Sequence, residues 1–471
     1  MLRRSILAVA ALAIAAQSPG LAADYPPLPA VGPTKPFTVP PAEAYQLPNG
    51  MRVTLVPFGQ VPKATVYLVV DTGGIDEGPN TGLANLTSQM LREGAGGHKG
   101  SELAATAASM GGSLQVGAGL LQTTAAIGVL SERAGDAIRL IGDVAEHPDF
   151  PASEFDRVRD NYLRSISVAK SQPQTAADVA LAAAYYGADS PYGRNFPTDA
   201  QAKAYTIGDV QRFYRDNFGA RRARLYVAGQ FDSAAVKAAI EQTFGNWAPG
   251  PEAHKTPPMP KPGPRVILVD RPGAPQSTVR LAFPAPVAGS PNDIPFQVTD
   301  ALLGGSFTSR ITRNIREVKG YTYSPFSYID LNPGEGRWQF DADITTDVTG
   351  PALKEVFGEI RRLQTEPVPD AEATGIRTWI AGTFVLQNAS SGGLIGSLSQ
   401  RDYYGLPANW LTTYVPSVLA VQDNQLGQLA RQYMPLDKMT LVVVGDLAKV
   451  EPQLKALPEL QGWQFERVKP F

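Results

Sequence analysis

Two copies of one pattern run through this chain of 471 residues. Short runs in the first half recur in the second half at an almost constant offset of 216 to 218 residues: 150–152 at 368–370, 185–187 at 403–405, and 228–230 at 444–446. Self-similarity at a fixed offset indicates that one structural unit occurs twice. The chain is therefore expected to contain two related domains.

Each copy combines strand signals with helix signals. Paired strands are predicted at the start of both copies, at 52–56 with 65–70 and at 265–269 with 278–283. Helical periodicity follows in the first copy at 81–93, 101–110, 134–145, 176–186, 206–217 and 234–244. Strand pairs joined by short turns and followed by helices predict an α+β fold, with mainly antiparallel sheets and helices packed on them.

The first 23 residues are explained better by export than by folding. They combine two arginines, a short apolar run from Ile6 to Ala16 and small residues at the end, a pattern typical of a cleaved signal peptide rather than of a retained anchor. We expect cleavage between Ala22 and Asp24 and delivery to the periplasm. No later apolar run approaches the length that a transmembrane helix needs.

Proline marks the other boundaries. Residues 24–50 are rich in proline, which favours an extended N-terminal arm, and 247–264 form a proline-rich linker. The sequence thus predicts an N-terminal domain at 51–246 and a C-terminal domain at 265–471.

Charge and cysteine content exclude several kinds of chemistry. A formal net charge of −2 gives no electrostatic argument for nucleic-acid binding. The chain has no cysteine, so it can form neither disulfides nor thiolate metal sites.

The predicted helix at 81–93 has the outline of a metal-binding helix without the ligands. Its surroundings read NGMRVTLVP, DTGGIDEGPNTGLA and MLREG, and they resemble the pitrilysin/insulinase family of inverted zinc peptidases, in particular its mitochondrial-processing-peptidase-like branch. That family carries H-x-x-E-H on this helix. Here the two ligand positions are Asn85 and Gln89, and the general-base position is Ser88. A carboxamide is a poor zinc ligand, and a serine hydroxyl is no base near neutral pH without an activating partner.

The third ligand of the family, a glutamate on a later helix, is also missing. Laid on the family pattern, its position is occupied by Ser165 and that of a supporting glutamate by Val158. His98, His147 and His254 have no second ligand at helical spacing. The resemblance therefore implies a degenerate zinc site and no metal or other cofactor in this chain.

The second half retains a different part of the family pattern. The segment REVKGYTYS contains Arg316 and Tyr323, seven residues apart as in the family motif L-R-E-x-x-G-L-x-Y-S. In that family the two side chains reach the substrate at the zinc site of an opposing domain or subunit. An isolated Arg or Tyr is ordinarily a surface ion pair or a core-edge aromatic, but the matching context favours a functional pair. Gly320 would let the backbone turn so that Tyr323 points inward.

The resemblance further implies two α+β domains arranged like a clam around a peptide chamber. It suggests a zinc-free subunit that pairs with a zinc-bearing homologue and supplies Arg316 and Tyr323 during peptide hydrolysis, inactive when alone. Residues 336–344 are one candidate for a chamber-lining strand, although an ordinary internal strand is an equal alternative. A non-catalytic peptide-binding or scaffold protein is the competing hypothesis, and an autonomous peptidase with replacement ligands is a third.

Overall fold

The computed structural model describes residues 38–471. The expected signal peptide, 1–23, and residues 24–37 of the expected arm lie outside the described residues. The remainder of that arm is not a free tether, because β1 (Glu43–Gln46) pairs antiparallel with β2 (Arg52–Pro57) at one edge of the first sheet.

The first sheet has six strands in the order β1-β2-β8-β3-β7-β6. Its other strands are β3 (Lys63–Val70), β6 (Gln115–Ala118), β7 (Thr123–Leu130) and β8 (Ala223–Gly229). Only β2 and β8 are parallel neighbours, and the other pairs are antiparallel. The expected strand pair at the start of the chain is therefore present but separated in the sheet by β8.

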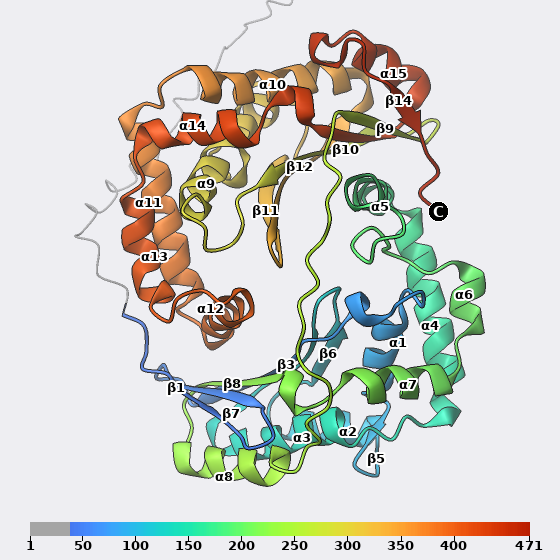
Figure 1. The fold of residues 1–471 in the computed structure, drawn as a ribbon, viewed down its shortest axis with the longest axis vertical. Coiled ribbons are helices and arrows are strands. Elements are labelled where there is room, and N and C mark those ends of the chain that lie inside the picture. The colour runs from blue at the N-terminus through green and yellow to red at the C-terminus, as the bar shows by residue number, and fades with distance from the viewer. Residues whose placement is uncertain (1–37) are drawn as a thin grey trace, which may run out of the picture. The chain divides into compact units, whose positions relative to one another are not determined.

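The second sheet also has six strands, in the order β11-β12-β10-β13-β9-β14. They are β9 (Arg265–Asp270), β10 (Gln276–Ala285), β11 (Phe326–Asn332), β12 (Glu335–Thr345), β13 (Thr440–Gly445) and β14 (Phe465–Arg467). The run β9-β13-β10-β12-β11 repeats the order β2-β8-β3-β7-β6, including the parallel pair at its start. This shared topology confirms the repeat and the α+β fold with two sheet-containing domains (Figure 1).

Helices fill the intervals between the strands. In the first half they are α1 (Leu83–Met90), α2 (Gly100–Ser109), α3 (Ala134–Glu146), α4 (Ala152–Ser171), α5 (Pro173–Tyr186), α6 (Asp199–Ala204), α7 (Ile207–Asn217) and α8 (Ser233–Phe244). In the second half they are α9 (Asp293–Asp300), α10 (Thr349–Thr365), α11 (Asp370–Gln387), α12 (Ser391–Tyr404), α13 (Trp410–Leu419), α14 (Asp423–Tyr433) and α15 (Leu447–Lys455). The expected linker, 247–264, contains no helix or strand in the described chain.

Strand alternation builds the core of the first half. Val53, Leu55, Val66 and Leu68 point to the same side of their strands as the period of two requires, and all four are buried in a cluster with residues of α1, α3 and α8. Local signals also place the helices. Thr206 caps α7, for example, because its hydroxyl accepts the Asp209 N–H while the Asp209 carboxylate accepts the Thr206 N–H.

The two halves exchange one helix each. α5, from the first half of the chain, packs on β9, β10 and β13 of the second sheet, and α12 packs on β3 and β8 of the first sheet. The second of these contacts includes hydrogen bonds of 2.8 Å between the Thr65 and Ser391 hydroxyls and from the Tyr226 hydroxyl to Asp402. The paired Tyr-Tyr-Gly runs thus end two helices that each cover the sheet of the other half.

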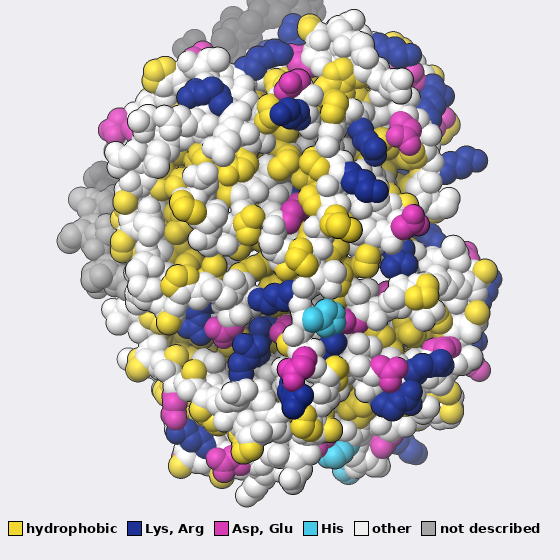
Figure 2. Space-filling view, in the orientation of Figure 1, with side chains coloured by type: hydrophobic (Ala, Val, Ile, Leu, Met, Phe, Trp, Pro, Cys, Tyr) yellow, Lys and Arg dark blue, Asp and Glu magenta, His cyan; other side chains and the backbone are white. Residues whose placement is uncertain are grey.

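No helix within 38–471 is long and apolar enough to cross a membrane. On the face drawn in Figure 2, apolar side chains gather around α9 and β11, while Lys, Arg, Asp and Glu side chains are interspersed around them. This mixed distribution agrees with the near-zero net charge and leaves that face without a basic patch.

Candidate functional site

The helix that resembles the family's metal-binding helix begins with an anionic cap. Gly82 precedes α1 with a φ of 87°, and the Glu77 carboxylate accepts the N–H groups of Gly82 and Ala84 at 2.7 Å each. Leu86 and Met90 are fully buried on the apolar face, as the periodicity predicts. Burial raises the pKa of Glu77 to about 7, against the two backbone hydrogen bonds, which lower it.

The degenerate positions on α1 are bonded to one another. The Gln89 side-chain amide donates to Asn85 Oδ1 at 2.7 Å, and the Ser88 hydroxyl donates to the Asn85 carbonyl at 2.8 Å. Ser165 lies on α4, which packs against α1, and its hydroxyl donates to the Tyr162 carbonyl at 2.7 Å. The structure thus brings both motif helices together.

This set of donors does not fit zinc, which is bound in proteins by histidine, carboxylate or thiolate side chains. Amide and hydroxyl groups occupy the three ligand positions Asn85, Gln89 and Ser165. Across 38–471, no group of three or more His, Cys, Asp or Glu side chains is arranged to hold a metal ion. No catalytic step can be derived through a metal at these residues.

Arg316 and Tyr323 are held side by side by the backbone between them. Arg316 lies on the π-helical segment η5 (Thr312–Val318), and Gly320, with a φ of 65°, reverses the chain. The returning strand is fixed because the Tyr321 N–H donates to the Ile315 carbonyl at 2.8 Å and the Thr322 hydroxyl donates to the Asp343 carbonyl at 2.7 Å. The bend expected at Gly320 is therefore present.

The Arg316 guanidinium lies over two aromatic rings. Its Cζ lies 5.0 Å from the ring centroid of Tyr323 and 4.5 Å from that of Phe307. Both rings are exposed, Tyr323 to 77% and Phe307 to 62%. Among the residues that the structure describes, the guanidinium and the Tyr323 hydroxyl have no hydrogen-bond or ion-pair partner. The Arg316 guanidinium and the Tyr323 hydroxyl are thus adjacent, and neither donates a hydrogen bond to another described residue.

Comparison with known proteins decides the family. Residues 53–194 match the insulinase family, peptidase family M16, and residues 204–378 match the peptidase M16 inactive domain. The chain belongs to peptidase family M16. The first match lies within the first repeat, and the second runs from the last part of the first repeat into the second.

The relatives with similar sequences include uncharacterized zinc proteases of several bacteria. One from Mycobacterium tuberculosis is 26% identical over 359 residues, 74% of this chain and 78% of the relative. YmxG of Bacillus subtilis is 24% identical over 402 residues, 83% of this chain and 96% of the relative.

Solved structures of other proteins share the fold. The peptidase M16 inactive domain from Pseudomonas fluorescens superposes with a TM-score of 0.79 at 21% identity and covers 86% of this chain and 98% of its own. A protease from Helicobacter pylori superposes with a TM-score of 0.79 at 18% identity and covers 87% of this chain and 100% of its own.

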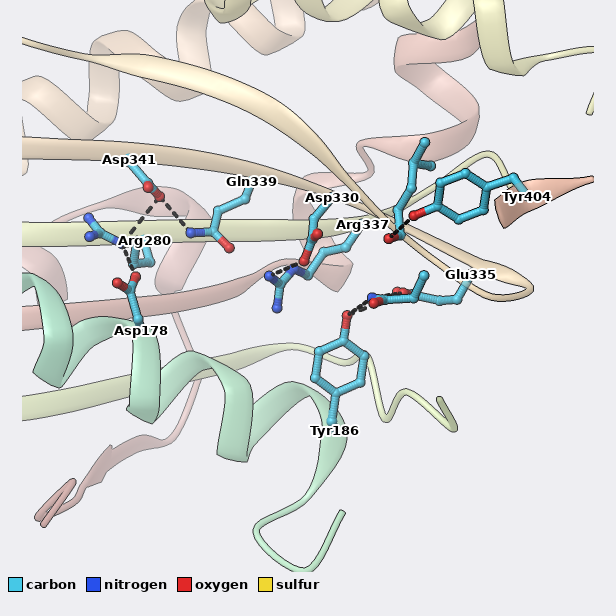
Figure 3. A network of polar contacts seen from close by, with 11 residues as sticks. Asp178, Tyr186, Arg280, Asp330, Glu335, Arg337, Gln339, Asp341 and Tyr404 are labelled. Atoms are coloured by element: carbon cyan, nitrogen blue, oxygen red, sulfur yellow. Dashed lines mark hydrogen bonds and ion pairs between the residues drawn. The ribbon is translucent and has the colours of Figure 1, made fainter. Parts of the chain in front are cut away.

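The M16 chain also carries a buried polar network that the sequence analysis missed. β12 is an internal strand, paired with both β10 and β11, so its edges are not free for a peptide. Its residues alternate between the apolar core, with Trp338 and Phe340, and a polar face, with Arg337, Gln339 and Asp341. In Figure 3, Asp178 and Tyr186 point from α5 toward this polar face.

Ion pairs join α5 to the second sheet through this network. Arg280 Nε lies 2.7 Å from Asp178 and 3.3 Å from Asp341, and Arg337 donates to Asp330 at 2.8 Å (Figure 3). Burial raises the pKa of Asp341 to about 6, although the neighbouring Arg280 charge lowers it. A cavity of about 190 Å³ lies between α5 and the strands, lined in part by Tyr328 and Asp330.

The alternation of polar and apolar residues along 335–343 was the available signal for this face. For Phe307 there was no local signal, because its contact with Arg316 depends on how the turn at 306–309 packs against η5. The network's ion pairs link the exchanged helix α5 to the second sheet, so its first role is structural.

Proposed function

We propose that this M16 chain is a zinc-free, non-autonomous subunit that completes the active site of a zinc-bearing homologue. In this heterodimer, Arg316 and Tyr323 would bind the oxygen of the scissile peptide carbonyl and stabilise the tetrahedral intermediate. The observation that carries the proposal is the stacked Arg316–Tyr323 pair, which is accessible and has no internal partner among the described residues.

Arg316 and Tyr323 suit the charge that develops during peptide hydrolysis. Negative charge develops on the carbonyl oxygen during hydrolysis, and a fixed guanidinium and phenol can each donate a hydrogen bond to it. Removal of one such donor in other hydrolases costs about 2.7–4 kcal/mol of transition-state stabilisation. An arginine already neutralised by a buried carboxylate would be a weaker donor, and Arg316 has no such neighbour in the described chain.

The α1–α4 region supports the proposal that the partner subunit alone binds zinc. Activation of water by zinc would fall to the partner subunit, because Asn85, Ser88, Gln89 and Ser165 offer neither zinc ligands nor a general base. Export to the periplasm, as expected from residues 1–23, is part of the same proposal and would place both subunits in one compartment.

The test is an oligopeptide cleavage assay with the purified protein, a zinc-bearing M16 relative from the same genome, and their mixture. We expect a large gain on mixing, lost about 100-fold or more in Arg316→Ala and about 10-fold or more in Tyr323→Phe. Arg313→Ala and Tyr321→Phe, from the same segment but outside the stack, serve as matched controls. No gain on mixing, or equal activity of all four variants, contradicts the proposal.

A second candidate is a non-catalytic peptide-binding or scaffold protein. The observation that favours it is the polar cavity of about 190 Å³ between α5 and the second sheet. This candidate predicts that Arg316→Ala and Tyr323→Phe leave the partner's activity unchanged, whereas Tyr328→Ala in the cavity wall weakens peptide binding. The cleavage assay, together with a measurement of peptide binding, therefore separates the candidates.

A further inference from the structure

Phe307 is an exposed aromatic residue on a firmly anchored turn. The turn follows η4 (Ala301–Gly305), and the Ser309 N–H donates to the Ser306 carbonyl at 3.1 Å. Just before the turn, Gly305 lies close to buried Asp300, which accepts the Trp338 indole N–H at 2.6 Å and the Ser327 hydroxyl at 2.5 Å. An aromatic ring that is 62% exposed on such a support is not explained by packing into the core.

The ring lies over the Arg316 guanidinium, as the ring of Tyr323 does. Both ring centroids lie within the roughly 6 Å over which an aromatic face attracts a cation. A guanidinium is planar and directs all its N–H groups outward within that plane. Two rings this close to the guanidinium restrict the directions from which an acceptor can reach its N–H groups.

We propose that Phe307 is the positioning residue that orients Arg316 for the carbonyl oxygen of the substrate. A free arginine side chain samples many rotamers, and ordering it during reaction would weaken the interaction with the transition state. Phe307 restricts this motion before the substrate binds. The Tyr323 ring also contacts the guanidinium, and its hydroxyl donates a hydrogen bond to the substrate. The catalytic consequence rests on the function proposed above, but the orientation of Arg316 does not.

The first experiment measures that orientation in the isolated protein by NMR of the arginine Nε–Hε groups. The Arg316 signal is identified by its loss in Arg316→Lys. We expect the wild-type signal to be displaced by ring currents and to report a restricted side chain, and both features to be lost in Phe307→Ala and Phe307→Leu but retained in Phe307→Trp. An unchanged Arg316 signal in Phe307→Ala overturns the proposal.

Leucine is the informative comparison because it preserves apolar bulk but has no aromatic face. If Phe307→Leu retained the restricted Arg316 signal, packing alone would hold the side chain and the stacking argument would be wrong. Circular dichroism and thermal unfolding of each variant show whether the fold is intact, which is expected because the ring is mostly exposed.

The second experiment measures kinetics in the mixture with the zinc-bearing relative. We expect Phe307→Ala and Phe307→Leu to lower kcat about three- to tenfold with KM within about twofold, and Phe307→Trp to stay within about twofold of wild type. A change confined to KM, or equal kcat in all variants, contradicts the positioning role. If the mixture has no activity, the proposed function fails, and the NMR result alone decides the role of Phe307.

Discussion

Glu77 places a carboxylate where the helix α1 begins, with two backbone N–H groups directed at it. The helix dipole and these bonds favour the charged form, but burial outweighs them and raises the pKa to about 7, from an ordinary value of 4.5. The folded protein therefore binds this proton more tightly than the unfolded chain does. Stability from this group is complete below pH 4.5 and is lost as the pH rises toward 7.

We expect Glu77→Gln to reduce the loss of stability with rising pH. The difference in unfolding free energy between wild type and Glu77→Gln should change by roughly 2–3 kcal/mol between pH 4.5 and 8, with wild type losing more. Urea unfolding at several pH values measures it. Glu102→Gln is the matched control, because Glu102 caps α2 through the Lys99 N–H but is exposed. Parallel pH profiles for wild type and Glu77→Gln would show that the carboxylate is not the source.

At the same scale, Arg316 and Tyr323 could be recognised from the sequence, whereas Phe307 could not. The first two are separated by a fixed spacing around a glycine, so a local pattern brings them together. The Phe307 ring reaches Arg316 from the separate turn at 306–309, outside the segment that carries Arg316 and Tyr323. Such a contact depends on how this turn and η5 fold together, and it produces no periodic pattern in the sequence.

Most helices and strands were predictable because their apolar residues follow a helical or a strand period. Which sheet a helix covers is a different kind of information. α5 was expected within the first domain by its position in the chain, yet it packs on β9, β10 and β13. Its alanine-rich sequence does not specify a sheet, and the polar contacts that mark the one it covers, Asp178 with Arg280, Gln174 with Asp343 and Tyr186 with Glu335, join residues far apart in the sequence.

We expect the ion pairs of Arg280 to hold the exchanged helix α5 on the second sheet. Arg280→Met should destabilise the protein by about 3 kcal/mol or more, because it leaves Asp341 buried without its cation. Adding Asp341→Leu should recover part of that loss, since the uncompensated charge is removed. Urea unfolding compares the single and double variants. Lys449→Met, in an exposed pair with Asp347, is the control and should cost no more than about 1 kcal/mol.

For the whole chain, helix exchange means that neither half buries its sheet alone. Without α5, the apolar residues Ile267, Ala282 and Val442 on the second sheet would face water, and without α12 the first sheet would lose the partners of Thr65 and Tyr226. Exposed apolar area of this kind is costly at about 25 cal/mol per Å². The two repeats should therefore behave as one folding unit, although the sequence presents them as two.

Cleavage of the linker tests this directly. A protease site inserted directly after Met259, which is 83% exposed, would cut the chain between the repeats. We expect the two fragments to stay together in size-exclusion chromatography and to unfold in a single transition, because each retains a helix bound to the other's sheet. Adding Arg280→Met should loosen the pair and lower the urea concentration at which the fragments separate. Separation of the cut wild type under native conditions would mean that the exchanged helices contribute little to the association of the two halves.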